Sequence, residues 1–392
     1  MGKIFIKELS IENTLSFGPD GNNIPLQPLN VIIGPNGSGK SNLIEIISLF
    51  QAMPTDLKQA IRKGGGAKDW LWKGEFEPIA KIETNLVCDD YIRDGKLLRY
   101  AMHFTAVNQR FEVFDEIIEN SEPNSGEEIP YFYYKYENNY PVINIKQQKR
   151  TLQRVTIDPE QSILSQRKDP DQYPELTWLG EQLKKIRIYR EWTFGRQALL
   201  SLPQDIDAPN DYLEPDCRNL GLVLNSFKKN PKVKRQIISL LGDFYEGIED
   251  FDVSIEGGSV QLFLTEGDLS IPATRLSDGT LRFLCLLAIL CHPTPPPLIC
   301  IEEPEIGIHT DIIPIIANLL KEASSRTQLI VTTHSEALVD ELTETPETVL
   351  VCEKQEGRTR LQRLKSEDLK AWLKKYSLGE LWRKGEIGGN RW

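Results

Sequence analysis

Three short runs of apolar residues stand out along the chain, at residues 31–33, 298–301 and 329–331. Continuous apolar runs of this length are typical of strands that are buried inside a sheet. A helical pattern follows the first run, from Asn42 to about Ala52, and Pro54 should end it. Buried strands that alternate with helices predict an α/β protein.

Other segments follow different patterns. Residues 3–11 alternate between polar and apolar positions and predict a first strand. Residues 79–114 are rich in β-branched and aromatic residues, which predicts several antiparallel strands, and the strand pattern returns at 251–263. Residues 131–136 predict another strand, and from about Asp158 the spacing becomes helical. The expected helices cover residues 174–190, 216–229 and 231–246.

Composition adds limits on the class of protein. The chain has 392 residues, of which 40% are hydrophobic. No apolar run approaches the length of a membrane span and the N-terminus has no signal-peptide pattern, so we expect a cytoplasmic protein without a membrane partner. The six cysteines are scattered and form no C-x-x-C pair, which favours reduced thiols over a zinc site.

The net charge of −11 argues against a general binder of polyanions. Basic residues nevertheless gather between positions 184 and 196, where we favour a helix with a solvated basic face, and DNA stays open as a partner. These residues are Lys184, Lys185, Arg187, Arg190 and Arg196.

The first apolar run leads into a segment with the spacing of a phosphate-binding loop. Gly34, four residues and then Gly39-Lys40-Ser41 match G-x-x-x-x-G-K-[ST]. Glycines let backbone N–H groups turn toward an anion, and the helix N-terminus adds further donors. Lys40 can reach the β- and γ-phosphates, and the Ser41 hydroxyl can bind Mg²⁺. The candidate nucleotide-binding residues are Asn36, Gly37, Ser38, Gly39, Lys40, Ser41 and Asn42.

The second apolar run ends in acidic residues, Glu302-Glu303-Pro304-Glu305. A buried strand followed by paired acids is the Walker B arrangement, in which one carboxylate holds Mg²⁺ and the next polarises the attacking water. The third run ends near a lone histidine, His334. Taken singly, the acids could form a solvated loop and His334 could be a structural histidine. Their order after a phosphate loop favours one shared site.

Residues 276–282, Leu-Ser-Asp-Gly-Thr-Leu-Arg, precede a strongly apolar helix that Ser277 should cap. This order of motifs resembles the ABC-type ATPase heads of the SMC, Rad50, RecF and OLD group, over residues 1–60 and 270–352. No heptad repeat is sustained between Ser41 and Ser277, so the insertion should be a compact lobe, which favours RecF or OLD over SMC and Rad50.

The resemblance implies a P-loop NTPase head of the ABC type, with a mixed β-sheet, an antiparallel β edge and a helical insertion lobe. It also implies a domain organisation. The expected domains are a discontinuous nucleotide-binding core at 1–75 and 251–352, a β-rich insertion at 76–157, a helical insertion lobe at 158–250, and a C-terminal helix and tail at 353–392.

In such heads ATP and Mg²⁺ are held between two copies in a head-to-tail homodimer. Ser277 and Gly279 of one copy would contact the nucleotide bound at Lys40 of the other. Glu303 would be the catalytic base and His334 would sense the γ-phosphate. The resemblance assigns the metal to Ser41, Glu302 and Gln166.

Three positions depart from the pattern of these heads. Glu302 stands where Asp is usual, which suggests slow turnover. Asp278 replaces a small residue of the signature and would repel an incoming polyphosphate unless it faces away. No clear Q-loop glutamine exists, and for Gln166 a plain surface-loop role is an equally good interpretation.

A second resemblance is to small stand-alone bacterial ATPases. It rests on residues 190–196 (Arg-Glu-Trp-Thr-Phe-Gly-Arg), 219–225 (Asn-Leu-Gly-Leu-Val-Leu-Asn) and 378–382 (Leu-Gly-Glu-Leu-Trp). Such proteins are associated with anti-phage defence and with a separate effector such as a Toprim-like nuclease. A RecF-like DNA-repair ATPase is the alternative, and the long insertion argues against a transporter subunit.

The tail contains a helical pattern at 366–375 and then apolar residues, Leu378, Leu381 and Trp382. Apolar residues near a terminus suggest a segment that docks on a partner. The alternative is that they pack on the protein itself.

Overall fold

The computed structural model describes residues 2–88, 97–137, 140–145, 148–151, 157–192, 200 and 202–389. Its contacts divide the chain into two compact units. The P-loop unit contains residues 3–186, 347–365 and 385–392, and the signature unit contains residues 1–2, 187–346 and 366–384. The domains expected from the sequence divide the chain at other points and stay a prediction.

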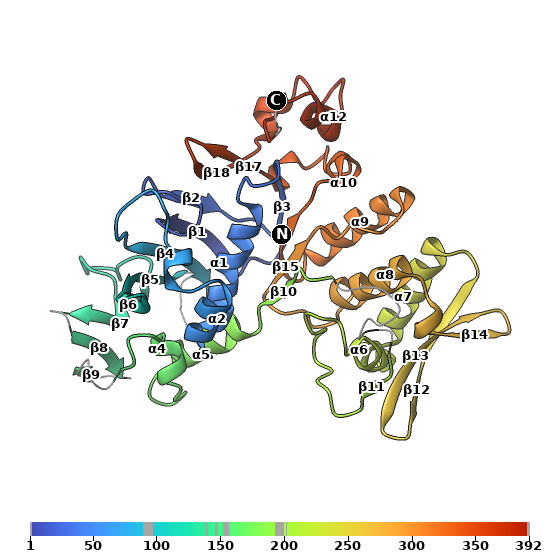
Figure 1. Cartoon of the computed structure of the whole chain (residues 1–392), viewed down its shortest axis with the longest axis horizontal. Helices are drawn as coiled ribbons and strands as arrows, with labels where there is room; N and C mark the ends of the chain where they lie inside the picture. The colour runs from blue at the N-terminus through green and yellow to red at the C-terminus, as the bar shows by residue number, and fades with distance from the viewer. Residues whose placement is uncertain are drawn as a thin grey trace. The chain divides into compact units, whose positions relative to one another are not determined.

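The P-loop unit contains an antiparallel sheet and a smaller mixed group of strands (Figure 1). The antiparallel sheet has the strand order β2-β1-β4-β5-β6-β7-β8-β9. In the mixed group, β3 pairs in parallel with β17, and β17 pairs antiparallel with β18. The antiparallel strands are β1 (Ile6–Glu12), β2 (Asn22–Pro25), β4 (Ala80–Val87), β5 (Leu97–Val107), β6 (Arg110–Asn120), β7 (Phe132–Glu137), β8 (Tyr140–Ile145) and β9 (Gln148–Thr151). The others are β3 (Leu29–Ile33), β17 (Val349–Gln355) and β18 (Arg358–Arg363).

The helices of this unit cover the apolar side of its strands. Helix α1 buries seven of its residues, and Phe50 on it contacts Tyr100 of β5 with the ring centroids 6.1 Å apart. The same core contains the fully buried Trp70. The helices are α1 (Lys40–Ala52), α2 (Leu57–Lys63), α3 (Ala67–Trp70), α4 (Ile163–Gln166) and α5 (Pro174–Lys184).

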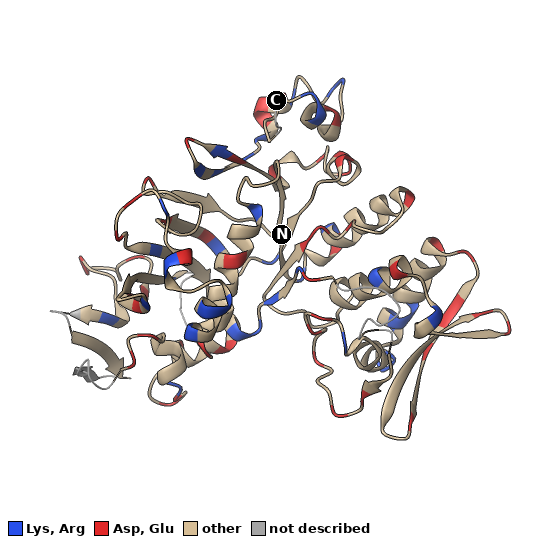
Figure 2. Ribbon diagram, in the orientation of Figure 1, with Lys and Arg blue, Asp and Glu red and all other residues tan. Residues whose placement is uncertain are grey.

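The signature unit is built on three parallel strands, with β15 (Leu298–Glu302) between β10 (Arg187–Tyr189) and β16 (Gln328–Thr332). A second, antiparallel sheet has the order β11-β13-β12, and β14 pairs with β13. In Figure 2, acidic and basic residues are interspersed along the ribbon of this unit. The second sheet comprises β11 (Gln204–Asp205), β12 (Ile248–Glu256), β13 (Ser259–Glu266) and β14 (Leu269–Pro272).

Helices pack on both sheets of the signature unit. Phe244 of α7 stacks on Phe283 of α8, with the ring centroids 4.5 Å apart. Helix α8 is almost wholly apolar and buries ten consecutive residues from Leu281 to Leu290. The helices are α6 (Leu220–Phe227), α7 (Pro231–Phe244), α8 (Asp278–Leu290), α9 (Ile313–Ala323), α10 (Glu336–Asp340), α11 (Ser366–Leu369) and α12 (Leu378–Arg383), with short 3₁₀ turns at Ala273–Arg275 and Thr310–Ile312. A third 3₁₀ turn, Pro346–Thr348, includes the last residue of the segment 187–346 and the first two residues of the segment 347–365 of the P-loop unit.

Most expected elements are present, but two expected helices are shorter than predicted. The helix predicted over 366–375 ends at Leu369, and turns follow it. The helix predicted over 174–190 ends at Lys184, and Arg187–Tyr189 forms β10 instead. Pairing with β15, in the register Ile188 opposite Cys300, outweighs the helical spacing of the sequence. The expected basic helix face is therefore wrong for Arg187, whose guanidinium lies over the ring of Tyr212 at 4.8 Å, whereas Lys184 and Lys185 are exposed at the end of α5. Arg196 lies outside the described residues.

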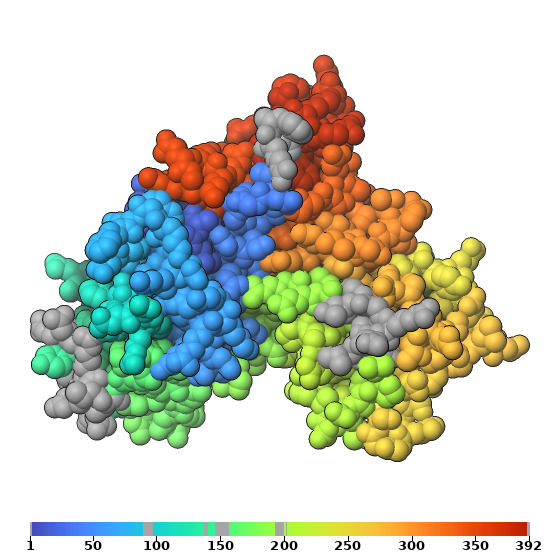
Figure 3. All heavy atoms as spheres, viewed as in Figure 1, coloured from blue at the N-terminus to red at the C-terminus, as the bar shows by residue number. Residues whose placement is uncertain are grey.

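The insertion has no long helix in its described part, where α7 is the longest with 14 residues. The tail also packs on the protein itself. Helix α12 lies against α10 (Figures 1 and 3). At this contact the amide of Gly379 donates to the carboxylate of Asp340 at 2.7 Å. Leu378, Leu381 and Trp382 are buried. Of the two interpretations of the tail, self-packing is confirmed for these residues.

All six cysteines are buried, and none forms a disulfide within the part of the chain that the structure describes. Among the described helices, none combines the length and the apolar character that crossing a lipid bilayer requires.

Candidate functional site

The phosphate-binding loop connects β3 to α1 in the P-loop unit, as its sequence predicts. Gly37 and Gly39 have φ values of +77° and +112°, which favour glycine. A Cβ atom at Gly39 would lie 2.1 Å from the Thr359 hydroxyl oxygen. At Gly34 a Cβ atom would lie 2.1 Å from the Cys352 carbonyl oxygen of β17. The loop therefore needs glycine at positions 34 and 39, because β17 and β18 lie too close to the loop backbone to leave room for a side chain.

Lys40 folds back over the loop. Its Nζ donates to the carbonyl oxygens of Gly34 at 2.8 Å and Pro35 at 3.1 Å. The Ser41 hydroxyl lies on an exposed residue of the first helical turn, and the N-cap Gly39 supplies no side-chain hydrogen bond to that turn. The first N–H groups of α1 are thus directed toward a position where an anion would be stabilised.

A hydrogen-bond network that includes Ser16 and Thr359 holds the phosphate loop in place. The Thr359 hydroxyl contacts Ser16 Oγ at 2.6 Å and the Ser38 carbonyl oxygen at 2.7 Å. Asn42, one of the predicted nucleotide-binding residues, donates to Ser16 Oγ at 2.6 Å. In this structure Asn42 therefore braces the loop. Ser16 and Thr359 were missed by the sequence interpretation, since only the fold brings them to the loop.

The Walker B acids lie in the signature unit, at the carboxyl end of β15. Glu303 adopts a left-handed conformation with φ +47°, which costs a non-glycine residue about 1–2 kcal/mol. Its N–H donates to the Thr332 carbonyl oxygen of β16 at 3.0 Å. Its Oε1 lies 3.9 Å from Nε2 of His334, and both side chains are about one-third exposed. Adjacent parallel strands thus bring the predicted catalytic pair together.

A third acidic residue supports this pair. Glu305 Oε1 accepts hydrogen bonds from the Thr333 hydroxyl at 2.6 Å and from the His334 N–H at 3.0 Å. These bonds fix the backbone from which the His334 side chain extends. The sequence signal for Glu305 was its place two residues after Glu303, but only the structure shows its partners.

The signature segment begins α8 as expected. Ser277 caps the helix by accepting from the Thr280 N–H at 3.1 Å, and both Ser277 and Asp278 are exposed. A Cβ atom at Gly279 would lie 2.9 Å from the Gly307 carbonyl oxygen, so this glycine allows close packing against the turn that follows the Walker B acids. The predicted cap at Ser277 is confirmed.

The predicted metal ligands fall in different places. Glu302 ends β15 beside Glu303, whereas Gln166 belongs to α4 of the P-loop unit. The Gln166 amide bonds locally: its oxygen accepts from the Asp158 N–H at 2.8 Å and its nitrogen donates to the Asp158 carbonyl oxygen at 3.1 Å. This arrangement favours the structural interpretation of Gln166, and its role as a metal ligand stays a prediction.

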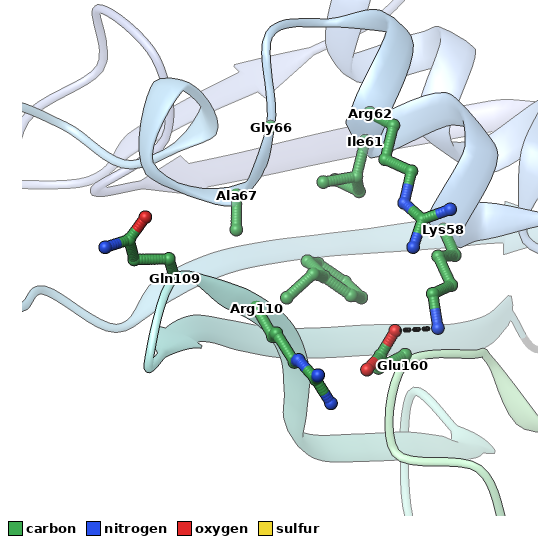
Figure 4. Close-up of a pocket in the computed structure, with 9 residues that line it drawn as sticks. Lys58, Ile61, Arg62, Gly66, Ala67, Gln109, Arg110 and Glu160 are labelled. Atoms are coloured by element: carbon green, nitrogen blue, oxygen red, sulfur yellow. Dashed lines mark ion pairs between the residues drawn. The ribbon is translucent and has the colours of Figure 1, made fainter.

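A separate pocket of about 290 Å³ opens in the P-loop unit between α2 and the β5–β6 hairpin (Figure 4). Lys58 and Glu160 form an ion pair in its wall, and Arg62 and Arg110 also line it. The pocket contains none of the residues that the sequence assigned to nucleotide binding.

Comparison with known proteins identifies the family. The profile of the family described as "AAA domain, putative AbiEii toxin, Type IV TA system" matches residues 29–340. The chain belongs to this AAA-domain family. No curated protein sequence matches the chain.

Solved structures of SMC heads share the fold of this AAA-domain protein. An SMC head bound to the C-terminal winged-helix domain of ScpA is 14% identical, with a TM-score of 0.59, and the match covers 93% of this chain and 99% of that one. The SMC head with an extended coiled coil bound to the C-terminal domain of ScpA, from Pyrococcus furiosus, is 13% identical, with a TM-score of 0.57 and coverage of 94% and 98%. The head with a coiled coil and joint from Pyrococcus yayanosii is 12% identical, with a TM-score of 0.52 and coverage of 94% and 99%. The expected α/β fold of an ATPase head of the SMC type is confirmed.

Proposed function

We propose that this AAA-domain protein binds ATP with Mg²⁺ and hydrolyses the bond between its β- and γ-phosphates. The P-loop unit would bind the phosphates through the loop N–H groups and Lys40, and Ser41 would bind the metal. In the signature unit, Glu302 would complete the metal shell and Glu303 would accept a proton from the attacking water. Mg²⁺ would supply charge neutralisation at the phosphates.

The observation that carries this proposal is the Glu303–His334 pair. Both side chains extend from the carboxyl ends of adjacent parallel strands, which is the edge where α/β sheets bind ligands. A carboxylate whose backbone N–H is anchored on the neighbouring strand is suited to positioning a water molecule for in-line attack. His334, 3.9 Å away, would contact the γ-phosphate or the same water.

We further propose that two copies dimerise head-to-tail around ATP, with Ser277 and Gly279 of one copy facing the nucleotide of the other. The exposed N-terminus of the 13-residue helix α8 supports this, because it offers N–H groups and a positive dipole end to an anion. The dimer would regulate a separate effector such as a Toprim-like nuclease. The family description, which names a toxin of a toxin–antitoxin system, supports a role in defence.

Turnover of ATP by matched variants tests the proposal. Lys40→Ala should lose binding of a fluorescent ATP analogue, and Glu303→Gln should bind it normally but hydrolyse ATP about 100-fold more slowly or worse. A control, Lys73→Ala, removes an exposed lysine that bonds to Asp69 and to the Lys68 carbonyl oxygen. Normal hydrolysis by Glu303→Gln would show that Glu303 is not the base. Normal binding by Lys40→Ala would refute the phosphate loop.

A further inference from the structure

Two side chains outside the predicted site hold the main chain of the Walker B acids. The Trp192 indole N–H donates to the Glu302 carbonyl oxygen at 2.9 Å. The Arg282 guanidinium donates to the next carbonyl oxygen, that of Glu303, at 2.7 Å. The guanidinium also lies over the Trp192 ring, 4.6 Å from its centroid. We call this stacked pair the Trp192–Arg282 clamp.

The clamp is built into the core of the signature unit. Arg282 is only 3% exposed and lies between the apolar residues Leu281 and Phe283 of α8. Burial lowers the pKa of its guanidinium to about 10. Trp192 is stacked on the buried Tyr189 of β10, with the centroids 6.3 Å apart. Burying a guanidinium costs desolvation free energy, which an apolar residue at this position of α8 would not cost. Its hydrogen bonding to the main chain must offset part of that cost.

The backbone that the clamp holds is strained. Glu303 has φ +47°, and such a conformation persists where surrounding contacts determine it. Its N–H is anchored on Thr332 at 3.0 Å and its carbonyl oxygen on Arg282 at 2.7 Å. Hydrogen bonds therefore hold both the N–H and the carbonyl group of Glu303. They fix the backbone conformation from which its carboxylate extends toward His334.

We propose that Arg282 and Trp192 are positioning residues that hold Glu303 in its left-handed conformation, so that its carboxylate faces His334 and the attacking water. The inference rests on the proposed ATPase function. Because Arg282 lies on the helix that Ser277 caps, the clamp also connects the signature motif to the Walker B acids within one unit. A shift of α8 when Ser277 meets a nucleotide would reach Glu303 through a single hydrogen bond.

The principal test uses Arg282→Met, which keeps the buried stem and removes the donor. We expect ATP affinity within twofold of wild type and kcat about 10- to 100-fold lower, because misplacing a reacting group by about 1 Å has effects of this size. Arg282→Lys, which keeps one charged donor, should recover part of kcat. Trp192→Phe should lower kcat about fivefold, the equivalent of one hydrogen bond. If Arg282→Met does not fold, Arg282→Lys and Trp192→Phe carry the test.

Arg326 offers a matched control. It is an arginine of the same unit whose guanidinium, like that of Arg282, donates to the main chain. Its partners are two carbonyl oxygens at the other end of α8, those of His292 at 2.5 Å and Leu290 at 2.6 Å. Arg326→Met should therefore lower the melting temperature to a similar extent without the loss of kcat. Equal losses of kcat in Arg282→Met and Arg326→Met would show a general structural effect and overturn the proposal.

A second measurement does not depend on hydrolysis. In protein with isotope-labelled histidine, the imidazole resonance of His334, assigned through His334→Gln, should move in Arg282→Met and stay in place in Arg326→Met. His103, beside Glu83 and Asp115, and His309, beside Asp311, serve as internal references. An unmoved His334 resonance would overturn the clamp. If wild-type protein does not hydrolyse ATP, the proposed function fails while this resonance still decides whether Arg282 positions Glu303.

Discussion

Replacing Gly39 by alanine tests why the phosphate loop needs glycine at this position. The reason is either the lack of space for a Cβ atom or only the left-handed backbone conformation. Gly39 has φ +112°, and a Cβ atom there would lie 2.1 Å from the hydroxyl oxygen and 2.8 Å from the methyl carbon of Thr359. Thr359 is 1% exposed and holds the Ser38 carbonyl oxygen, so it cannot turn away without losing that bond. Gly37 is the control: its φ is +77°, and a Cβ atom there meets nothing within 4 Å.

The expected magnitudes differ accordingly. For Gly37→Ala, the left-handed backbone alone costs about 1–2 kcal/mol. For Gly39→Ala, overpacking adds about 1–3 kcal/mol and a broken hydrogen bond about 1 kcal/mol, so the whole loss is about 3–6 kcal/mol. With a urea m value of about 2 kcal/mol/M, the unfolding midpoint of Gly39→Ala should lie about 1–2 M below that of Gly37→Ala.

Urea unfolding followed by circular dichroism measures both variants. Thr359→Ala provides a further check, because it should destabilise the wild-type protein but recover part of the stability in the Gly39→Ala background, where it removes the two nearest obstructing atoms and leaves Ser16 Oγ at 2.9 Å. Equal midpoints for Gly39→Ala and Gly37→Ala, or purely additive effects with Thr359→Ala, would refute the packing argument.

Three further predictions concern other parts of the chain. Hydrogen bonds from His103 and Arg99 lower the pKa of Glu83 from 4.5 to about 2, so its stabilising contribution is present above pH 4.5 and is lost as the pH falls toward 2. Glu83→Gln should therefore lower the melting temperature at neutral pH but progressively less on acidification, and a difference that is constant with pH would contradict this. Ser277→Ala should cost about 1 kcal/mol of stability, measured by calorimetry, because the helix cap is lost. Ser277→Asp should keep the cap but impair ATP-dependent dimerisation, measured by light scattering, because its carboxylate repels the phosphates. If both variants lose stability and dimerisation to the same extent, Ser277 does not have separate roles in capping and in binding the nucleotide. Leu381→Ala, at a fully buried position of α12, should cost about 2–5 kcal/mol in urea unfolding, whereas a docking segment would tolerate it.

The sequence predicted those parts of the site that depend on local order. The loop at Gly34–Ser41 and the cap at Ser277 follow from residue spacing, because both are formed within a few residues of chain. The closeness of Glu303 and His334 follows from two apolar runs that form adjacent parallel strands. In each case the local pattern and the final packing agree.

Other parts depended on contacts that one sequence does not display. Arg282 occurs in a run of apolar residues, and nothing in the run shows that its guanidinium bonds to Glu303. Residues 187–189 have helical spacing, but β15 offers a strand edge to pair with. The sequence of the tail left two interpretations open. Leu381 is buried against α10, which lies about 40 residues earlier in the chain, and the local sequence does not show that contact.

The most direct test of the proposed ATP-controlled dimer is the molar mass of Glu303→Gln by light scattering during size-exclusion chromatography. With ATP and Mg²⁺ the mass should be twice the protomer mass of 44.7 kDa, and with ADP it should be that of one protomer. Adding Ser277→Asp to Glu303→Gln should abolish the ATP-dependent dimer. A protomer mass in saturating ATP, with the nucleotide shown to be bound, would contradict the proposal that two copies complete the site.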